Sequence, residues 1–366
     1  MVYLLVPLDL SYGREVIRGV REYTRANRLW QLVVVPATLA NLRAARREKA
    51  DGIIGLLGTR PLEQAARATK IPAVNATGKG SGGRLPSVGP DDLAIGRIAA
   101  EHFLQRGFRQ FAFAAARDDH SAHARRQGFG ETLAAAGFGC EVFAEGHDAR
   151  WIRALPKPAG VLACNDVRAR DLVVAALRAG LRVPQDLSVV GVGNDETLCE
   201  LAEVPLSSID PDARRIGFEA AQMLDRLIAG KSVDSAGDVV PPAGLVLRDS
   251  SDSLAVGDDQ LANAMRYMQA HACDPMKVTD MLDVVKVSRR TLEKRFRTTF
   301  GRTLHDEIRR LQFERARQLL CDTDLKIPQV ATRCGFRDPK RFTTLFREEF
   351  GSPPITFRRD AREVTP

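Results

Sequence analysis

Residues 327–346 read IPQVATRCGFRDPKRFTTLF, and this stretch decides the fold of the C-terminal region. Its apolar residues recur at helical spacing on both sides of Gly335, and Asp338 followed by Pro339 is typical of a helix N-terminus. Proline suits the first helical turn because the amide hydrogen that it lacks would have no partner within the helix. We therefore predict two short helices joined by a turn, a helix-turn-helix motif at about 326–348.

An earlier copy of the same pattern lies at about 277–297. Its first helix is expected to begin after Lys277, and Ser288 is expected to cap a second helix whose inward residues are Leu292 and Phe296. A long helix predicted over 303–320 would join the two copies. Charged faces are common on any single amphipathic helix, but two copies in tandem favour a DNA-binding domain over an ordinary small helical domain.

The outward residues of the two second helices are mostly cationic or polar, as a helix in the major groove requires. From Asp258 onward the chain has 22 Lys and Arg against 16 Asp and Glu, so most of its net charge of +8 lies there. Such an excess favours phosphate contacts. The candidate DNA-binding residues are Arg289, Arg290, Glu293, Lys294, Arg297, Lys340, Arg341, Thr344 and Arg347.

Residues 261–361 resemble the DNA-binding domain of the AraC family, and the match includes Ser288, Leu292, Phe296, Gly301, Ala316, Leu319, Ile327, Val330, Cys334, Gly335, Phe336, Phe342, Phe346, Gly351, Pro354 and Phe357. The resemblance implies that the two second helices read successive major-groove segments of an operator. The first motif departs from the family pattern at two positions. Asp283 would need a partner on a partly buried face, and Lys286 replaces a frequent glycine in the turn, where strain is expected.

Residues 2–247 alternate short apolar runs with helical patterns, which predicts parallel sheets wound by right-handed crossovers. We expect a ligand-binding domain at 1–248, a Ser- and Asp-rich linker at 249–260 and the DNA-binding domain at 261–366. No apolar run approaches the ~20 residues that cross a bilayer. The N-terminus lacks a secretory leader, and six scattered cysteines fit a reducing compartment, so a cytoplasmic protein without metal or cofactor is expected.

In an open parallel sheet a ligand binds beyond the carboxyl ends of the strands. Polar residues follow several predicted strands here, and their carboxylates and amides suit the hydroxyl groups of a polyol. Helix capping is the alternative role for such residues, Asp166 and Asp91 in particular. The candidate ligand residues from this pattern are Asp9, Ser11, Tyr12, Asn165, Asp166 and Asn194, with Arg14 and Asp195 beside them.

Residues 2–250 resemble the periplasmic-binding-like sensor domains of the Lac repressor family. The matching stretches are Val88-Gly-Pro-Asp91, Arg125-Arg-Gln-Gly128-Phe129, Ala163-Cys-Asn165-Asp166 and Pro205-Leu-Ser-Ser-Ile209 with Gly217. The resemblance implies two lobes that close on a sugar and adds Asp91 and Arg125 to the ligand candidates. It also implies a homodimer through the sensor domains and contact with RNA polymerase. Gly193 stands where these sensors often place a sugar-binding Asp.

The sequence thus predicts a two-lobed α/β periplasmic-binding-like sensor with doubly wound parallel sheets, followed by an all-α domain with two helix-turn-helix motifs. The expected function is sugar-responsive regulation of transcription, as an activator of a carbohydrate operon with a pentose such as xylose as ligand. One alternative is a sensor-like domain that binds no sugar and serves dimerisation or protein sensing. An enzyme is not expected, because Cys164 has neither a glycine-rich elbow nor a recognisable His partner.

Overall fold

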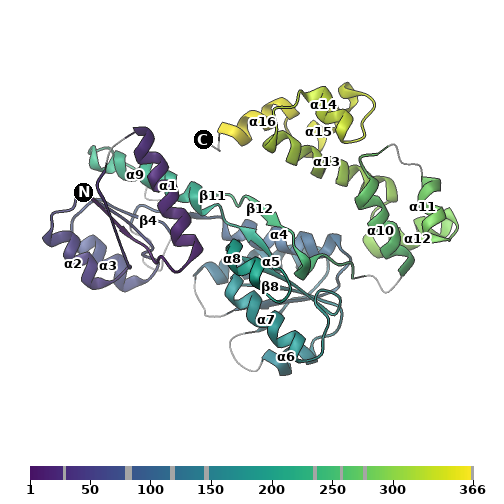
Figure 1. Cartoon of the computed structure of the whole chain (residues 1–366), viewed down its shortest axis with the longest axis horizontal. Helices are drawn as coiled ribbons and strands as arrows, with labels where there is room; N and C mark the ends of the chain where they lie inside the picture. The colour runs from purple at the N-terminus through teal and green to yellow at the C-terminus, as the bar shows by residue number, and fades with distance from the viewer. Residues whose placement is uncertain are drawn as a thin grey trace. The chain divides into compact units, whose positions relative to one another are not determined.

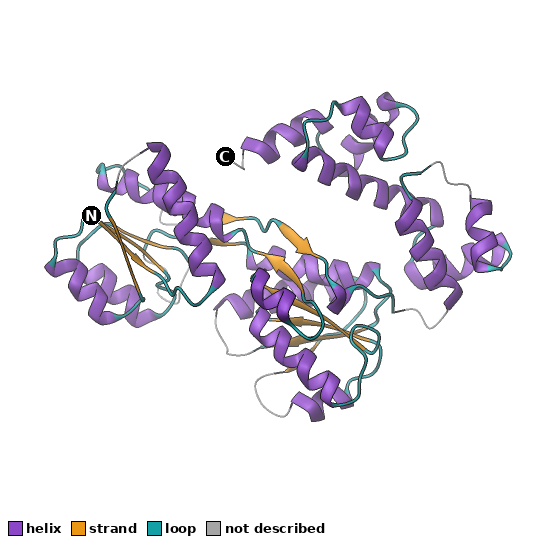
Figure 2. Ribbon diagram, viewed as in Figure 1, coloured by secondary structure: helices purple, strands orange, loops and turns teal. Residues whose placement is uncertain are grey.

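The computed structural model describes residues 1–27, 30–78, 85–115, 120–143, 148–233, 237–255, 259–274 and 278–363. The chain divides into two compact units, Met1–Ala255 and Val256–Pro366, and Figure 1 labels many of their helices and some of their strands. Figure 2 shows strands only in the first unit, whereas the described part of the second is helical. No helix among the described residues is long and apolar enough to span a membrane.

The first unit begins with a four-stranded parallel sheet in the order β2-β1-β3-β4. Its strands are β1 (Val2–Leu5), β2 (Leu32–Val35), β3 (Gly52–Gly55) and β4 (Ala73–Asn75). Helices α1 (Ser11–Asn27), α2 (Leu39–Arg47), α3 (Arg60–Ala68) and α9 (Ala213–Ile228) belong with this sheet. Every residue of β1 and β3 is buried, as expected for a parallel sheet covered on both faces.

A second sheet has six strands in the order β12-β10-β9-β8-β6-β7. Only the pairing of β12 (Gly244–Val246) with β10 (Ser207–Asp210) is antiparallel. The remaining strands are β6 (Gln110–Ala114), β7 (Glu141–Phe143), β8 (Ala159–Ala163) and β9 (Leu187–Val192), and the helices are α4 (Asp92–Gln105), α5 (His120–Ala135), α6 (Asp148–Ala154), α7 (Asp166–Arg178) and α8 (Glu196–Leu201). The fold class predicted for this region is confirmed.

The chain crosses between the two sheets three times. A short parallel pair, β5 (Val88–Pro90) with β11 (Asp238–Val240), packs on the first sheet, and the crossings follow Pro90, Asp210 and Val240. Two backbone hydrogen bonds join the crossings, from Asp91 to Val240 at 2.9 Å and from Ala243 to Asp210 at 3.0 Å. We call residues 1–90 with 212–240 the first lobe, and residues 91–210 with 244–255 the second lobe.

Each lobe contains one helix pair that crosses at glycines. A Cβ atom on Gly19 of α1 would lie 1.8 Å from a backbone oxygen of α9, and one on Gly217 of α9 would lie 2.1 Å from a backbone oxygen of α1. In the second lobe, Gly96 of α4 and Gly128 of α5 show the same reciprocal contact, each at 2.1 Å. Only glycine permits such close backbone approach, which gives Gly128 and Gly217 of the family pattern a packing role.

The second unit contains the two predicted helix-turn-helix motifs. The first consists of α11 (Val278–Val285) and α12 (Arg289–Phe300), and the second of α14 (Ile327–Arg333) and α15 (Pro339–Phe350). Helix α13 (Leu304–Asp322) connects them, while α10 (Asp259–His271) and α16 (Pro354–Glu363) complete the unit. Ser288 and Asp338 cap α12 and α15, accepting from backbone N–H groups at 3.3 and 2.8 Å. Lys277 lies outside the described residues.

The segment predicted as a linker begins inside the first unit. Residues Asp249–Ser251 form a short 3-10 helix, in which Ser250 and Ser251 are fully buried. The Ser250 hydroxyl donates to the Val189 carbonyl at 2.7 Å and accepts from the Ser207 N–H at 2.8 Å. Asp259 already begins α10, and residues 256–258 lie outside the described part of the chain. The connection between the units is therefore shorter than the predicted 249–260.

Candidate functional site

The first-lobe side of the candidate ligand site is the start of α1. Tyr12 is partly buried, and its hydroxyl donates to the carbonyl of Ala76 at 2.8 Å. Burial raises the pKa of Tyr12, the charge of Asp92 raises it further and the charge of Arg125 opposes both. The phenol therefore stays protonated, and it lies within electrostatic range of two side chains of the second lobe.

Those two side chains form an ion pair. Arg125 Nε donates to Asp92 Oδ1 at 2.7 Å, and its NH1 donates to the Cys164 carbonyl at 2.6 Å. The side chains of Arg125 and Asp92 are only 13% and 10% exposed. Arg125 thereby links α4, α5 and the carboxyl end of β8. Such a fixed guanidinium can also donate to ligand hydroxyl groups.

Asp91 has the capping role that the sequence left open as an alternative. Its Oδ1 accepts from the Ala94 N–H at 2.8 Å at the start of α4. The neighbouring Asp92, which was not among the predicted residues, makes the contact with Arg125 instead. Two adjacent carboxylates give no sequence signal as to which of them caps the helix. The predicted residues Asp91 and Arg125 pointed to this corner of the site, but not to Asp92 itself.

Asp166 is 4% exposed and held on both carboxylate oxygens. Oδ1 accepts from the Ser208 hydroxyl at 2.5 Å, and Oδ2 accepts from the Asp195 N–H at 2.9 Å. Burial raises the pKa of Asp166, and these two hydrogen bonds act against that rise. The carboxylate therefore joins β10 and the start of α8 to α7. It supports the site, and its oxygens already have partners.

Gly193 makes room for Asp166. A Cβ atom at Gly193 would lie 3.0 Å from Asp166 Oδ2, and the glycine has φ +131, a conformation that other residues rarely adopt. Gly191 is still closer, since its Cβ would lie 2.3 Å from Asp166 Oδ1. An Asp side chain at position 193 would place a second carboxylate beside a buried one. The departure from the family pattern at Gly193 thus coincides with the burial of Asp166.

The two candidate asparagines, Asn165 and Asn194, differ in their hydrogen-bond partners. Asn165 is exposed, and its Oδ1 caps α7 by accepting from the Arg168 N–H at 2.8 Å. Asn194 has φ +48, donates to Asp210 Oδ2 at 3.2 Å and accepts from Arg248 at 3.1 Å. Because Asp210 precedes one of the three crossings, Asn194 contacts the connection between the lobes. The amide nitrogen of Asn165 has no such contact with the crossings among the interactions described.

One ion pair joins the lobes at the same place. Arg14 of α1 lies 3.4 Å from Asp195 Oδ2, and it also donates to the backbone carbonyl of Asp9 at 3.2 Å. The side chain of Asp9 is exposed, and Ser11 is partly buried at the first position of α1. Through Arg14, Tyr12 and Arg125 the structure thus brings the polar residues at the strand ends of both lobes into one neighbourhood.

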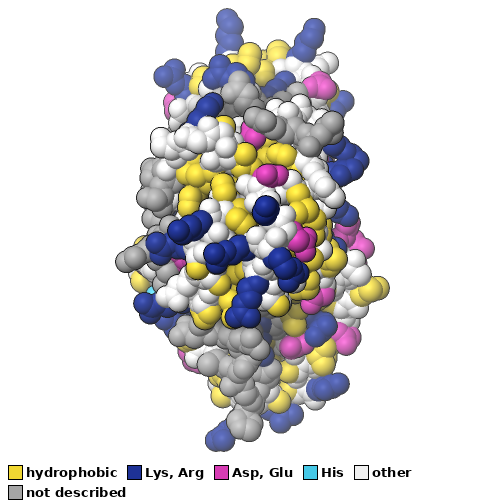
Figure 3. Space-filling model, turned by 90° about the vertical axis from the view of Figure 1, so that its left-hand side faces the viewer, with side chains coloured by type: hydrophobic (Ala, Val, Ile, Leu, Met, Phe, Trp, Pro, Cys, Tyr) yellow, Lys and Arg dark blue, Asp and Glu magenta, His cyan; other side chains and the backbone are white. Residues whose placement is uncertain are grey.

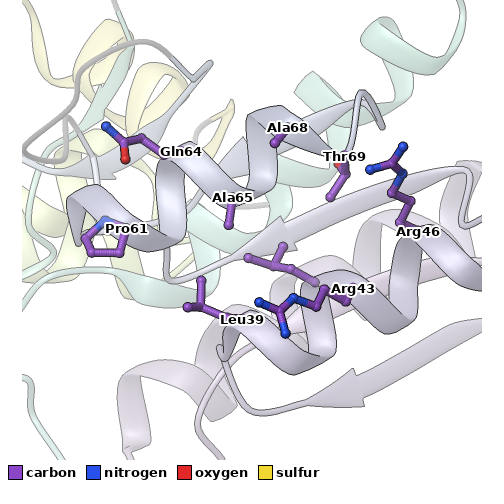
Figure 4. A pocket seen from close by; sticks show the side chains of 9 residues that line it. Leu39, Arg43, Arg46, Pro61, Gln64, Ala65, Ala68 and Thr69 are labelled. Carbon is purple, nitrogen blue, oxygen red and sulfur yellow. The ribbon is translucent and has the colours of Figure 1, made fainter.

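A surface hollow of about 500 Å³ lies elsewhere, between α2 and α3 (Figure 4). Leu39, Pro61 and Ala65 form part of its apolar lining, and Arg43 and Arg46 stand on the α2 side. Figure 3 shows Lys and Arg side chains interspersed with apolar ones on the face of the molecule at this end. None of the candidate ligand residues lines this hollow.

The candidate DNA interface lies on α12 and α15. All nine predicted residues are exposed: Arg289, Arg290, Glu293, Lys294, Arg297, Lys340, Arg341, Thr344 and Arg347. The inward residues are fully or almost fully buried, among them Leu292 on α12 and Phe342 on α15. Arg289 Nε donates to Glu293 at 2.8 Å, so Glu293 orients a cation on this surface. Both helices therefore present cationic faces of the kind that the major groove accepts.

Comparison with known proteins gives matches for both units. The family described as periplasmic binding protein-like domain matches residues 100–251, and a helix-turn-helix domain family matches residues 281–360. The xylose operon regulatory proteins of Haemophilus influenzae and Escherichia coli K12 are each 29% identical to this chain. They align over 98% and 99% of it and over 97% and 98% of their own lengths.

Among solved structures, a xylose-binding transcription activator is 28% identical, with a TM-score of 0.62 and coverage of 98% of this chain and 97% of its own. Both units are thus matched in one protein and in the same order. The chain therefore combines a periplasmic binding protein-like domain with an AraC-type helix-turn-helix domain, in the arrangement of the xylose operon regulators that it resembles over nearly its full length.

Proposed function

We propose that this protein is a sugar-responsive, DNA-binding regulator of transcription that activates a carbohydrate operon. The observation that carries the proposal is the likeness of this chain to xylose operon regulators over nearly its full length. The chain itself has a two-lobed domain and two helices with exposed basic residues. The proposed ligand is a pentose, with D-xylose as the first to test. The curated relatives named above are regulators, which supports a role other than catalysis.

The proposed mechanism begins at the strand ends of the two lobes. A sugar held by Asp9, Tyr12, Arg125 and Asn165 would contact both lobes, and the difference in its affinity for two lobe arrangements would shift the equilibrium between them. In a homodimer through the first units, this shift would change the spacing of the reading helices on operator DNA. We also propose contact with RNA polymerase, as the AraC family resemblance implies.

A thermal-shift screen against pentoses, hexoses and sugar acids tests the proposal, because a ligand that binds only the folded state raises the melting temperature. The sharpest variant is Asn165→Asp. It retains a helix-capping oxygen but loses the amide donor, so the unliganded protein should melt as before while sugar affinity falls about tenfold or more. Gln64→Glu, the same exchange beside the α2–α3 hollow, should leave affinity unchanged.

A second function is favoured by the internal hydrogen bonds of Asp166 and Asn194. If these polar groups are structural, the first unit would serve dimerisation or bind a protein, without a sugar. The same screen separates the two. No shift with any sugar, from a protein that melts cooperatively and binds DNA, would favour this second function over sugar sensing.

A further inference from the structure

Two cysteines that are far apart in the sequence meet beneath the second helix-turn-helix motif. Cys273 follows α10, and Cys334 ends α14 directly before the turn. Cys334 is fully buried and Cys273 is partly exposed, and both pack in the apolar cluster that includes Phe313 and Phe342. Gly335, the residue after Cys334, lies against the backbone of Cys273, because a Cβ atom at Gly335 would be 3.0 Å from the Cys273 carbonyl oxygen. The two cysteines therefore lie close together in the folded unit.

The backbone around this pair is tightly packed. A Cβ atom on Gly335 would lie 3.0 Å from the carbonyl oxygen of Cys273 and 2.9 Å from Gln312 Nε2. Gln312 in turn donates to the carbonyl of Ala272 at 2.8 Å. The turn of the second motif is thus held against the end of α10 and against α13, and there is little space for it to move without disturbing these contacts.

The electrostatic surroundings distinguish the two thiols. The hydrogen bond from Cys334 lowers the pKa of Cys273, the charge of Arg315 lowers it further, and burial and Asp274 oppose this. The same hydrogen bond raises the pKa of Cys334, as does burial. Cys273 therefore has the thiolate character and partial exposure of a reactive cysteine, and Cys334 is a protonated partner beside it.

Cys140 and Cys199 of the first unit lack this combination. Burial raises the pKa of Cys140 to about 12 and that of Cys199 to about 12. No other cysteine contributes to the raised pKa of either thiol. Cys321 is exposed on α13 and provides a matched control thiol within the second unit.

We propose that Cys273 and Cys334 form a reversible disulfide, made by a hydroperoxide, that releases the second helix-turn-helix motif from DNA. The site is thus an oxidation site within the DNA-binding unit, separate from the sugar site. Its effect on DNA rests on the proposed function, whereas the formation of the disulfide does not.

The reaction balances in two steps. The Cys273 thiolate attacks the outer oxygen of the hydroperoxide, the O–O bond breaks, and the alcohol or water leaves with a proton, which gives a sulfenic acid on Cys273. The Cys334 sulfur then attacks the Cys273 sulfur, the S–O bond breaks, and water leaves with the Cys334 proton. Two thiols are oxidised by two electrons and the peroxide is reduced. A dithiol reductant reverses the change.

The effect on DNA follows from geometry. A disulfide requires the two sulfurs, which are not bonded in this structure, to approach to about 2.05 Å. Because the packing around Gly335 leaves little space, this approach must shift the turn or the end of α10. Helix α15 follows the turn directly and carries Lys340 and Arg341 on its exposed face. A displaced α15 would no longer fit the major groove together with α12.

The test uses the full-length protein, titrated with hydrogen peroxide. Peptide mass spectrometry should show a Cys273–Cys334 cross-link. Fluorescence anisotropy on a duplex selected from a random pool by the reduced protein should show at least a tenfold loss of affinity, restored by dithiothreitol. Cys321→Ser should retain both responses. Cys273→Ser and Cys334→Ala should each abolish the cross-link and keep DNA affinity high after peroxide.

Two results would overturn the inference: oxidation of Cys273 without a link to Cys334, or a complete cross-link that leaves DNA affinity unchanged. The serine variant at the partly exposed Cys273 guards against a folding failure of the variant at the buried Cys334. If the reduced protein selects no duplex at all, the proposed function fails, and the mass spectrum still decides whether the cysteines form a disulfide.

Discussion

The two helix-turn-helix motifs form their turns in different ways. In the first, Lys286 has φ +53, and in the second, Gly335 has φ +81. A left-handed residue with a side chain costs about 1 kcal/mol relative to glycine. The first turn accommodates a lysine whose side chain is exposed, whereas the second turn has its neighbours within 3.0 Å of the missing Cβ. The turn of the first motif therefore accepts a residue with a side chain, whereas the turn of the second motif requires glycine.

Their cores differ as well. Around the second motif, the Phe313 ring centroid lies 5.5 Å from that of Phe336, and Phe346 is 5.6 Å from Phe342 and 4.5 Å from Phe350. In the first motif, the ring contact found for Phe296 among the described residues is with Phe300, at 4.5 Å. The comparison indicates that the second helix-turn-helix motif has the more extensive aromatic core.

The largest expected effect comes from truncating these cores. Phe346→Ala should destabilise the second unit by about 3–5 kcal/mol, because a fully buried ring leaves a cavity within an aromatic cluster. Phe296→Ala should cost less within that range, since Phe296 has one ring contact among the described residues whereas Phe346 has four. Chemical denaturation of both variants measures the difference. A larger loss for Phe296→Ala would reverse the ranking of the two motifs.

Much of this architecture was predictable because it depends on local patterns. Helical spacing and capping residues located both motifs, and the predicted strain at Lys286 appears as a positive φ. Asp283 differs from expectation, since it is exposed and needs no buried partner. The reason is that Met281 and Val285 occupy the inward face of α11.

Contacts between distant parts of the chain were not predictable. The pairing of Asp92 with Arg125, in place of Asp91, depends on which of two adjacent carboxylates caps α4. The approach of Cys273 to Cys334 depends on how three helices pack. No residue pattern in a single sequence reports such geometry, whereas the strand-end position of the ligand candidates followed from the topology alone.

Substitutions in the two turns should change the stability of the second unit in opposite directions. Gly335→Ala should destabilise the second unit by about 1–3 kcal/mol, because it adds both a left-handed alanine and a steric clash. Lys286→Gly should instead be close to neutral or stabilise it by less than about 1 kcal/mol. The urea midpoints of both variants against the parent give the signs. If Gly335→Ala proved neutral, the second turn would be as permissive as the first.

The reading helices should differ in their contribution to operator affinity. Arg341→Ala on α15 should weaken operator binding by about 1–3 kcal/mol. Arg290→Ala on α12 should weaken it by a smaller amount, because the better-packed second motif is expected to hold its side chains in place for base contacts. Anisotropy titrations at several salt concentrations separate base contacts from phosphate contacts. Sugar affinity should be unaffected in both. Equal losses in operator affinity would indicate that the two motifs contribute alike despite their different anchoring.

The smallest expected effect is the loss of stability at acidic pH that follows from protonation of Glu307. Glu307 at the start of α13 is fully buried and pairs with Arg302 at 2.5 Å and Arg310 at 2.9 Å. Burial alone would raise the pKa of Glu307, but the hydrogen bonds and charges of Arg310 and Arg302 outweigh it and lower the pKa. The stabilisation is therefore complete above the ordinary glutamate pKa and is lost as the pH falls through the lowered value.

Glu307 lies beside the first motif, so acid should loosen α12 before α15. Hydrogen-exchange protection, corrected for the intrinsic pH dependence, follows both helices between neutral and acidic pH. Glu314→Gln, which changes an exposed partner of Arg310, should preserve this order. Simultaneous loss of protection in α12 and α15 would show that α13 couples the motifs into one unfolding unit.

The three crossings between the lobes have a practical consequence for dissecting this protein. Each lobe is assembled from two separate stretches of chain, since α9 and β11 return to the first lobe after β10, and β12 then returns to the second lobe. No single cut can release either lobe as an intact fragment, and a truncation anywhere between residues 91 and 240 removes parts of both. The first lobe is complete only after β11 and the second only after β12, so the candidate ligand site can form only when nearly the whole first unit has been synthesised.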